Sequence, residues 1–234
     1  MASTAESQGE ESYRRIKHDI ICCVLQPASE ITEGELCDRY GLGKASVRTA
    51  LARLNQEGLL KGLPRRGHMI APITLGDVAA VFELRVILEP AAARLAAERA
   101  DETTLRALVD LAQPLKMPVE RGQGEFLRSN LRLNHQFHVG IAVASGNQRL
   151  TTSIAQLLEA VERVLHLWMS TQPSMDQQLA HEYGEHTEVA AALFAREGEK
   201  AAKLVEEHLV IAREGIFSSL MRNPQSLTLQ VARS

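Results

Sequence analysis

The chain has 234 residues, of which 45% are hydrophobic, 24% are charged and 4% are aromatic. This composition is typical of a globular protein and excludes an intrinsically disordered chain, while the scarcity of aromatic residues favours helices over sheets. No apolar run reaches the roughly 18 to 20 residues of a membrane helix, and the N-terminus shows no signal-peptide pattern, so we expect a cytoplasmic protein without membrane contact. The three cysteines follow neither a disulfide nor a zinc spacing and are expected to be reduced.

The net charge of -3 conceals a basic segment. Between Lys44 and Arg66 the only acid is Glu57, and the basic residues are Lys44, Arg48, Arg53, Lys61, Arg65 and Arg66. Such a segment in an acidic protein indicates one surface that meets phosphates. The alternative at this stage is a solvated basic surface without a partner.

The first third of the chain predicts short helices followed by a hairpin. Residues 1–10 are predicted to be a flexible tail, and a helix begins near Glu11 and ends at Pro27. Thr32 and Glu35 form a capping-box pattern that begins a second helix. Gly41 and Gly43 separate it from a third, whose apolar stripe ends before Gly58. Residues 59–60 and 69–70 then read as strands around the turn 64–67.

The remainder of the chain is predicted to be entirely helical. Together with the helices and hairpin of the first third, this predicts two domains: a winged helix-turn-helix domain at residues 11–72 and an all-α helical bundle at residues 74–222. Residues 223–234 are predicted to be a flexible tail. The expected helices span about 75–99, 102–115, 125–145, 147–171, 177–197 and 199–221. The fold class is thus mainly α, with about six helices in the C-terminal domain.

The third helix and the hairpin carry the candidate DNA-binding residues. A helix that enters the major groove presents polar side chains from its first turns and packs its apolar side inward. The hairpin tip would reach an adjacent groove, and its glycine would let the backbone approach the sugar-phosphate chain. The predicted contacts are Lys44, Ser46, Arg48, Thr49, Arg65, Arg66, Gly67 and His68.

Polar residues in the helical half suggest a metal site. Asn134 and His138 are four residues apart and share one side of a helix, and His186 and His208 lie near apolar helical stripes. Three imidazoles and one oxygen ligand suit zinc, nickel or manganese. The alternative is that each histidine is an ordinary surface or core residue.

Arg85 is the candidate effector-binding residue. A guanidinium directed into an apolar bundle can hold a carboxylate through two parallel hydrogen bonds. An ion pair with Glu89, four residues on, explains the same arginine equally well.

The ordered series of motifs adds a resemblance. Ser46–Leu54, Glu57–Leu60 and Pro64–Gly67 resemble the N-terminal domain of the GntR family of bacterial repressors, over about Tyr13 to Pro72. The resemblance implies DNA contacts from Lys44, Arg48, Gly67 and His68. Two departures are Gly34, where many relatives carry a DNA-contacting arginine, and Gly43, where Ser or Thr usually caps the recognition helix.

The second half resembles the FCD ligand-binding domain of the FadR-type branch, over about Thr74 to Arg222. The similarity rests on Phe82–Arg85, Leu88–Pro90, Asn134–His138, Ser145–Asn147, Glu185–His186 and Glu207–Leu209. It implies that Asn134, His138, His186 and His208 hold a divalent metal ion. Many relatives have Asp in place of Asn134, and a neutral amide lowers the expected metal affinity.

These observations predict a transcriptional regulator rather than an enzyme. We expect a homodimeric repressor that binds double-stranded operator DNA and responds to a small carboxylate metabolite. The alternative from another class is a metal-dependent hydrolase or lyase with Glu185 as general base. A third possibility is that the metal only stabilises the bundle.

Overall fold

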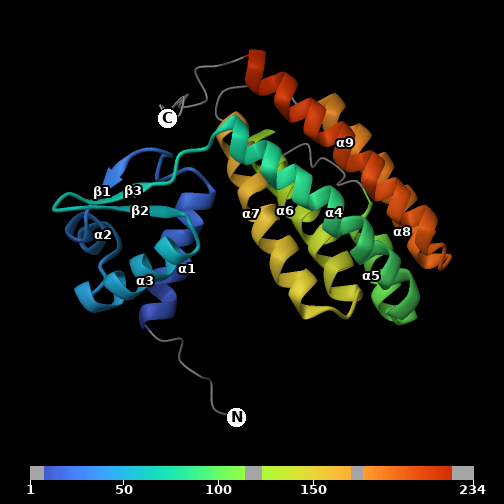
Figure 1. The fold of residues 1–234 in the computed structure, drawn as a ribbon, viewed down its shortest axis with the longest axis horizontal. Helices are drawn as coiled ribbons and strands as arrows, with labels where there is room; N and C mark the ends of the chain where they lie inside the picture. Colours follow the sequence, from blue (N-terminus) through green and yellow to red (C-terminus); the bar gives the residue numbers. More distant parts are fainter. Residues whose placement is uncertain (1–7, 114–122, 170–175, 223–234) are drawn as a thin grey trace, which may run out of the picture. The chain divides into compact units, whose positions relative to one another are not determined.

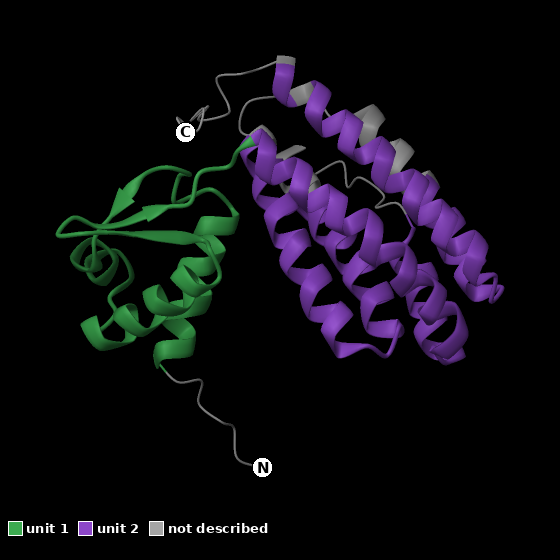
Figure 2. Cartoon of the chain, viewed as in Figure 1, with its two compact units in different colours: residues 1–74, 225–234 green, residues 75–224 purple. Residues whose placement is uncertain are grey.

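The computed structural model describes residues 8–113, 123–169 and 176–222, and these residues form two compact units (Figure 2). The chain divides between Thr74 and Leu75. The predicted tail at residues 223–234, and residues 1–7 of the predicted N-terminal tail, lie outside the described residues. Within the described part, no helix combines the length and the apolarity needed to cross a membrane.

The first unit is a helix-turn-helix with a three-stranded sheet, which confirms the predicted winged fold (Figure 1). Strand β3 lies between β1 and β2 and pairs antiparallel with both. Apolar side chains from all three helices pack into one core. The elements are α1 (Gln8–Ile21), β1 (Glu30–Ile31), α2 (Glu33–Tyr40), α3 (Lys44–Gln56), β2 (Leu60–Leu63) and β3 (Gly67–Ile70).

Helix α1 begins three residues before the predicted start near Glu11, so residues 8–10 of the predicted tail are helical. Two contacts stabilise this first turn. The hydroxyl of Ser12 donates a hydrogen bond to the carbonyl oxygen of Gln8 at 2.7 Å, and Arg53 of α3 donates to the Glu10 carboxylate at 3.0 Å. The second contact crosses between helices, which explains why the local sequence pattern did not reveal it.

Strand β1 was not predicted, because two residues are too few to show an alternating pattern. It also gives Gly67 a role different from the predicted one. Gly67 has a φ of 100°, and a Cβ at this position would lie 2.4 Å from the carbonyl oxygen of Ile31. The close approach of β3 to β1 therefore requires glycine, whereas a DNA contact at Gly67 stays a prediction.

The ends of α2 and the start of α3 follow the sequence signals, whereas α1 ends at Ile21, six residues before the predicted stop at Pro27. The capping box at Thr32 is confirmed, since its hydroxyl accepts from the amide of Glu35 and the Glu35 carboxylate accepts from the amide of Thr32. Gly41 ends α2 in the left-handed conformation. Gly43 occupies the N-cap of α3 and provides no side-chain hydrogen bond, so the recognition helix begins without a side-chain cap.

The described residues of the second unit are helical, as predicted, apart from their connections. Alanines of α4 pack against α9, and the core continues through α5 to α8. The predicted helices are present with ends that differ by a few residues, the largest difference being α5, which stops four residues early. They are α4 (Leu75–Arg99), α5 (Glu102–Leu111), α6 (Gln123–Ala144), α7 (Gln148–Met169), α8 (Asp176–Phe194) and α9 (Gly198–Arg222).

Candidate DNA-contact surface and buried histidine centre

Helix α3 has the two-sided character that a recognition helix needs. Lys44, Arg48 and Thr49 are exposed, whereas Val47 and Leu51 are buried in the core of the unit. Ser46 is half-buried, and its hydroxyl donates to the carbonyl oxygen of Gly43 at 2.8 Å. The predicted polar side of α3 is thus available to a partner from solvent.

Arg48 is held by a carboxylate that the sequence analysis did not single out. Its Nε and Nη2 donate to the two oxygens of Glu33 at 3.1 and 3.0 Å, in a fork geometry. The Arg48 side chain is nevertheless 71% exposed. The hydrogen bonds from Arg48 lower the pKa of the Glu33 carboxyl, and the charges of His68 and Lys44 lower it further. Glu33 therefore lies among three of the predicted DNA-contact residues.

The hairpin tip is also cationic and accessible. Arg65 and Arg66 are both exposed, and Arg66 forms an ion pair with Glu30 of β1 at 3.0 Å. Arg65 has a φ of 66°, a left-handed conformation that is uncommon outside glycine. His68 is half-buried, and its Nδ1 has no hydrogen-bond partner among the described residues.

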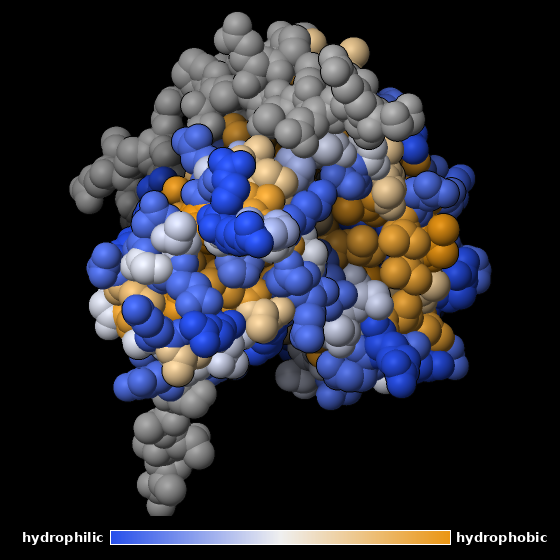
Figure 3. Space-filling view, turned by 60° about the vertical axis from the view of Figure 1, so that its left-hand side comes forward, coloured by the Kyte–Doolittle hydropathy of each residue, from blue (hydrophilic) through white to orange (hydrophobic). Residues whose placement is uncertain are grey.

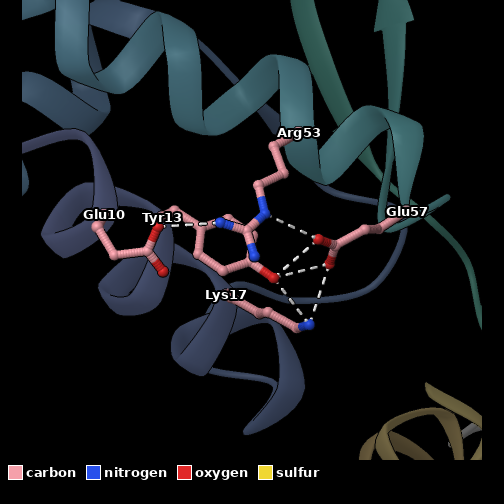
Figure 4. A network of polar contacts seen from close by, with 5 residues as sticks. All are labelled: Glu10, Tyr13, Lys17, Arg53 and Glu57. Carbon is pink, nitrogen blue, oxygen red and sulfur yellow. Dashed lines mark hydrogen bonds and ion pairs between the residues drawn. The ribbon is translucent and has the colours of Figure 1, made fainter. Parts of the chain in front are cut away.

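A polar cluster fixes the C-terminal end of α3 to α1 (Figure 4). The Tyr13 hydroxyl donates to Glu57 at 2.8 Å, and Lys17 forms an ion pair with the same carboxylate at 3.0 Å. The guanidinium of Arg53 lies 3.5 Å from the centre of the Tyr13 ring. Burial alone would raise the pKa of Glu57, yet the hydrogen bonds from Tyr13 and Lys17 bring it below its usual range. The cluster sets the orientation of the recognition helix within its unit.

In the second unit, the structure brings three of the four predicted metal ligands together. His138 of α6, His186 of α8 and His208 of α9 are all buried, and one ring nitrogen from each lies within 4.8 Å of the others. The Nε2 atoms of His186 and His208 are 3.3 Å apart. In the described part of the chain, this is the one group of histidine, cysteine or acidic residues with such spacing.

Two carboxylates orient the histidine rings. Nδ1 of His138 lies 2.7 Å from Glu89, and Nδ1 of His208 lies 2.7 Å from Glu185. Because an ionised carboxylate only accepts hydrogen bonds, Nδ1 of His138 carries the proton and donates it to Glu89, which leaves Nε2 with a free lone pair. That Nε2 is buried and has no hydrogen-bond partner among the described residues. Such carboxylate–histidine pairs are typical of metal sites.

The protonation states also suit a metal ion. Burial lowers the pKa of His138 to about 4. Burial also lowers the pKa of His186 well below its usual value, and the electrostatic effect of His138 and His208 lowers it further. Both imidazoles are therefore neutral at physiological pH, the form that coordinates metals. Burial would raise the pKa of Glu89, but the Arg85 charge and the His138 hydrogen bond outweigh it, and the pKa is lowered to about 2.

Arg85 is buried beside this centre. Its Nε donates to Glu89 at 2.6 Å, so the ion pair that the spacing predicted is present. Its two terminal amino groups make no hydrogen bond to any residue that the structure describes. One carboxylate thus joins Arg85 to His138, and the guanidinium retains unused donors at a buried position.

Asn134 lies one turn before His138 on α6 and is half-buried. It lines a groove between α6 and α7 together with His135 and Glu162. Nδ1 of His135 lies 3.6 Å from Glu162, too far for a good hydrogen bond. The amide of Asn134 as a fourth ligand stays a prediction.

The residues of the histidine centre fit a divalent metal ion. Two nitrogen ligands at about 2.0–2.1 Å from a tetrahedral ion are roughly 3.3 Å apart, which is the separation of the two Nε2 atoms. The same separation also allows a hydrogen bond between the two rings when one of the Nε2 atoms carries a proton. Glu185 is the residue that a metal-dependent hydrolase would use as general base. In the structure its carboxylate accepts a hydrogen bond from His208 and orients that ring.

A winged helix-turn-helix followed by a separate helical unit defines a class of DNA-binding transcriptional regulators. Two family models match: that described as bacterial regulatory proteins, gntR family, covers residues 8–70, and that of the FCD domain covers residues 80–210. The chain therefore belongs to the GntR family of bacterial transcriptional regulators, with a C-terminal FCD domain.

Several bacterial regulators match most of the chain. The HTH-type transcriptional repressor GlaR of Escherichia coli K12 is 25% identical over 201 residues, which are 86% of this chain and 91% of GlaR. The repressor RspR of the same organism is 25% identical over 207 residues, 88% of either chain. The Nta operon transcriptional regulator of Aminobacter aminovorans is 27% identical over 185 residues, 79% of this chain and 83% of the relative.

Solved structures show the same fold. Escherichia coli McbR/YncC superposes with a TM-score of 0.75 at 22% identity, covering 91% of this chain and 98% of that chain. A GntR regulator from Rhodococcus sp. RHA1 superposes with a TM-score of 0.71 at 19% identity, covering 90% and 98%.

Proposed function

We propose that this regulator is a homodimeric repressor whose binding to operator DNA is controlled by a small carboxylate metabolite bound beside a divalent metal ion. The observation that supports this most strongly is the buried group of His138, His186 and His208 next to Arg85. A centre of buried imidazoles that can hold a metal ion, beside one guanidinium with unused donors, is suited to bind an anion in an apolar bundle.

His138, His186 and His208 would hold the metal, with Glu89 and Glu185 fixing two of the rings. A bound zinc, nickel or manganese ion supplies a positive charge that attracts a carboxylate oxygen. Asn134 is the proposed fourth ligand. The terminal amino groups of Arg85 would donate to the effector carboxylate, while Nε stays on Glu89.

Helix α4 connects the proposed effector site to the DNA-binding unit through the chain itself. It begins at Leu75, directly after the last residue of that unit, and it carries both Arg85 and Glu89. Ten residues of helix span about 15 Å. A displacement of α4 by the effector would therefore act on the recognition helices of a dimer with a coupling free energy of about 1–3 kcal/mol.

A second copy of the chain is the proposed partner of an exposed apolar surface. Leu84 and Ile87 of α4 are three residues apart and share one side of the helix, with 48% and 60% of their surface exposed. Figure 3 shows a broad hydrophobic area on the right-hand side of the molecule. Large exposed apolar areas mark association surfaces, and a two-fold dimer would place two recognition helices on a pseudo-palindromic site.

The experiment combines gel retardation with thermal-shift screening of the full-length protein. We expect sequence-selective, salt-dependent retardation of DNA from its own promoter region, and release by an organic acid, sugar acid or amino acid that also raises the melting temperature. Arg85→Lys should weaken that response at least tenfold because it loses the fork, whereas Arg94→Lys on the same helix should leave it unchanged. An effector response that survives Arg85→Lys at full strength would contradict the proposed site.

A further inference from the structure

The ion pair between Glu33 and Arg48 divides the arginine into an occupied and an unoccupied edge. A guanidinium has five N–H donors and two edges that can each make two parallel hydrogen bonds. Glu33 occupies the edge formed by Nε and Nη2, at 3.1 and 3.0 Å. The opposite edge, formed by Nη1 and the second hydrogen of Nη2, contacts no residue in the described part of the chain.

We infer that Glu33 is a specificity-determining residue, which holds Arg48 so that its unoccupied edge reads a guanine in the major groove. The inference rests on the proposed binding to operator DNA. Guanine presents two acceptors, O6 and N7, that match one guanidinium edge, and this is the commonest specific contact of arginine with a base. An arginine already held on its other edge keeps the orientation that this contact needs, because its rotation is restricted before DNA arrives.

The local structure holds Glu33 firmly enough for this role. It is the first residue of α2, directly after the capping box of Thr32, and the positive end of the helix favours its carboxylate. Its side chain is 32% exposed, less than half the exposed fraction of Arg48. Glu33 is thus the anchored partner of the pair, and Arg48 is the partner that reaches toward solvent.

The effect of removing the Glu33 carboxylate on DNA affinity distinguishes an orienting role from a purely electrostatic one. A carboxylate on a surface that faces phosphates repels DNA, so its removal should strengthen binding to any sequence. If Glu33 orients Arg48, the same removal should weaken recognition of one base pair. Loss of specificity together with unchanged or stronger non-specific binding is therefore the expected signature.

The test uses the full-length protein and duplexes that the wild type enriches from a randomised library. Glu33→Gln keeps the size of the side chain but has one acceptor oxygen, so the fork cannot form. Dissociation constants are measured for the enriched duplex, for versions with each G·C pair replaced in turn, and for a scrambled duplex. Asp38→Asn is the matched control, since it removes one negative charge from the exposed surface of the same helix.

For Glu33→Gln we expect the preference for one G·C pair to fall by about 5- to 150-fold, the range of one two-pronged base contact. Arg48→Ala should abolish preference at the same pair, and the double variant should lose no more than Arg48→Ala alone. Asp38→Asn should keep the preference. If the wild type enriches a sequence and Glu33→Gln keeps the full preference for every G·C pair, this inference is overturned and the proposed DNA binding stands. The same holds if Glu33→Gln binds the enriched duplex more tightly than the wild type does. A library from which the wild type enriches nothing would overturn the proposed DNA binding with it.

Discussion

Glu89 joins the two halves of the proposed effector site, since one of its oxygens lies 2.7 Å from Nδ1 of His138 and the other accepts from Nε of Arg85 at 2.6 Å. All three side chains are buried. The carboxylate therefore sets the direction of a metal-ligand ring and the direction of an anion-binding guanidinium at the same time.

Glu89→Gln should lower metal affinity by about 10- to 100-fold, the usual effect of removing a carboxylate that orients a ligating histidine. Affinity is measured by competition with a chelator of known strength. Glu83→Gln, at an exposed position on the same helix, is the control and should bind metal like the wild type. Equal affinities for the two variants would show that Glu89 has no part in the site.

His186→Ala should abolish tight binding of zinc or nickel, because it removes one of the three clustered imidazoles. His135→Ala removes a histidine from the neighbouring groove and should leave metal binding intact. Isothermal titration of the metal-free proteins distinguishes the two. If His186→Ala bound the metal as tightly as the wild type, the metal site would have to be formed by other residues.

The metal-free protein should lose stability as the pH falls from 6.5 toward 4. Burial lowers the pKa of His138 from 6.5 to about 4, so the unfolded chain binds a proton in this interval that the folded protein does not. By linkage, the contribution of His138 is complete above pH 6.5, and its loss at pH 4 is on the order of 3 kcal/mol. Urea unfolding at pH 7, 5.5 and 4 measures the effect. His138→Gln should show a weaker pH dependence, and an unchanged slope would speak against a neutral His138.

Gly67→Ala should destabilise the wing by about 1–3 kcal/mol, since the added Cβ meets the Ile31 carbonyl and the left-handed backbone disfavours a side chain. Gly62→Ala is the matched control on β2, where a Cβ has nothing within 4 Å. It should change stability by no more than about 0.5 kcal/mol. Urea unfolding followed by hydrogen exchange of the strands measures both, and equal losses would contradict the internal role of Gly67.

Tyr13→Phe should cost about 1 kcal/mol, because it removes the hydroxyl that donates to Glu57 and accepts from Lys17, while the ring still packs against Arg53. Glu57→Gln should couple to it, so that the double variant loses less than the two single losses together. Both are measured by thermal unfolding of the full-length protein. Strict additivity would mean that the contact contributes nothing to stability.

Most of the fold could be predicted because its signals are local. The capping box at Thr32, the glycines around α3 and the 3.6-residue periodicity of the C-terminal half each depend on residues a few positions apart. Strand β1 was missed because its two residues pair with β3, nearly forty positions later. The early start of α1 was missed for the same reason, since its first turn is held by Arg53.

The sequence predicted which residue types form the candidate site, but it did not predict the hydrogen bonds and ion pairs between them. Histidine spacing and family resemblance pointed to His138, His186 and His208, which the fold brings together. The four-residue spacing indicated an ion pair between Glu89 and Arg85, which the structure contains. No local pattern indicated that Glu89 also contacts His138, 49 positions later in the chain. Glu33 went unnoticed because its arginine lies fifteen residues away on another helix. Polar contacts between elements depend on side-chain directions that a linear pattern does not contain.

The alanines between α4 and α9 make one side of the helical unit intolerant of added volume. Ala97 is buried there, and a Cβ on Gly198 would lie 3.5 Å from the Cβ of Ala97 and 3.3 Å from the carbonyl oxygen of Arg94. Larger residues at this seam would force the two backbones apart, since close-packed interiors have little room to adjust. Natural variation among such regulators should therefore be smaller at this seam than on the exposed surface of the helical unit.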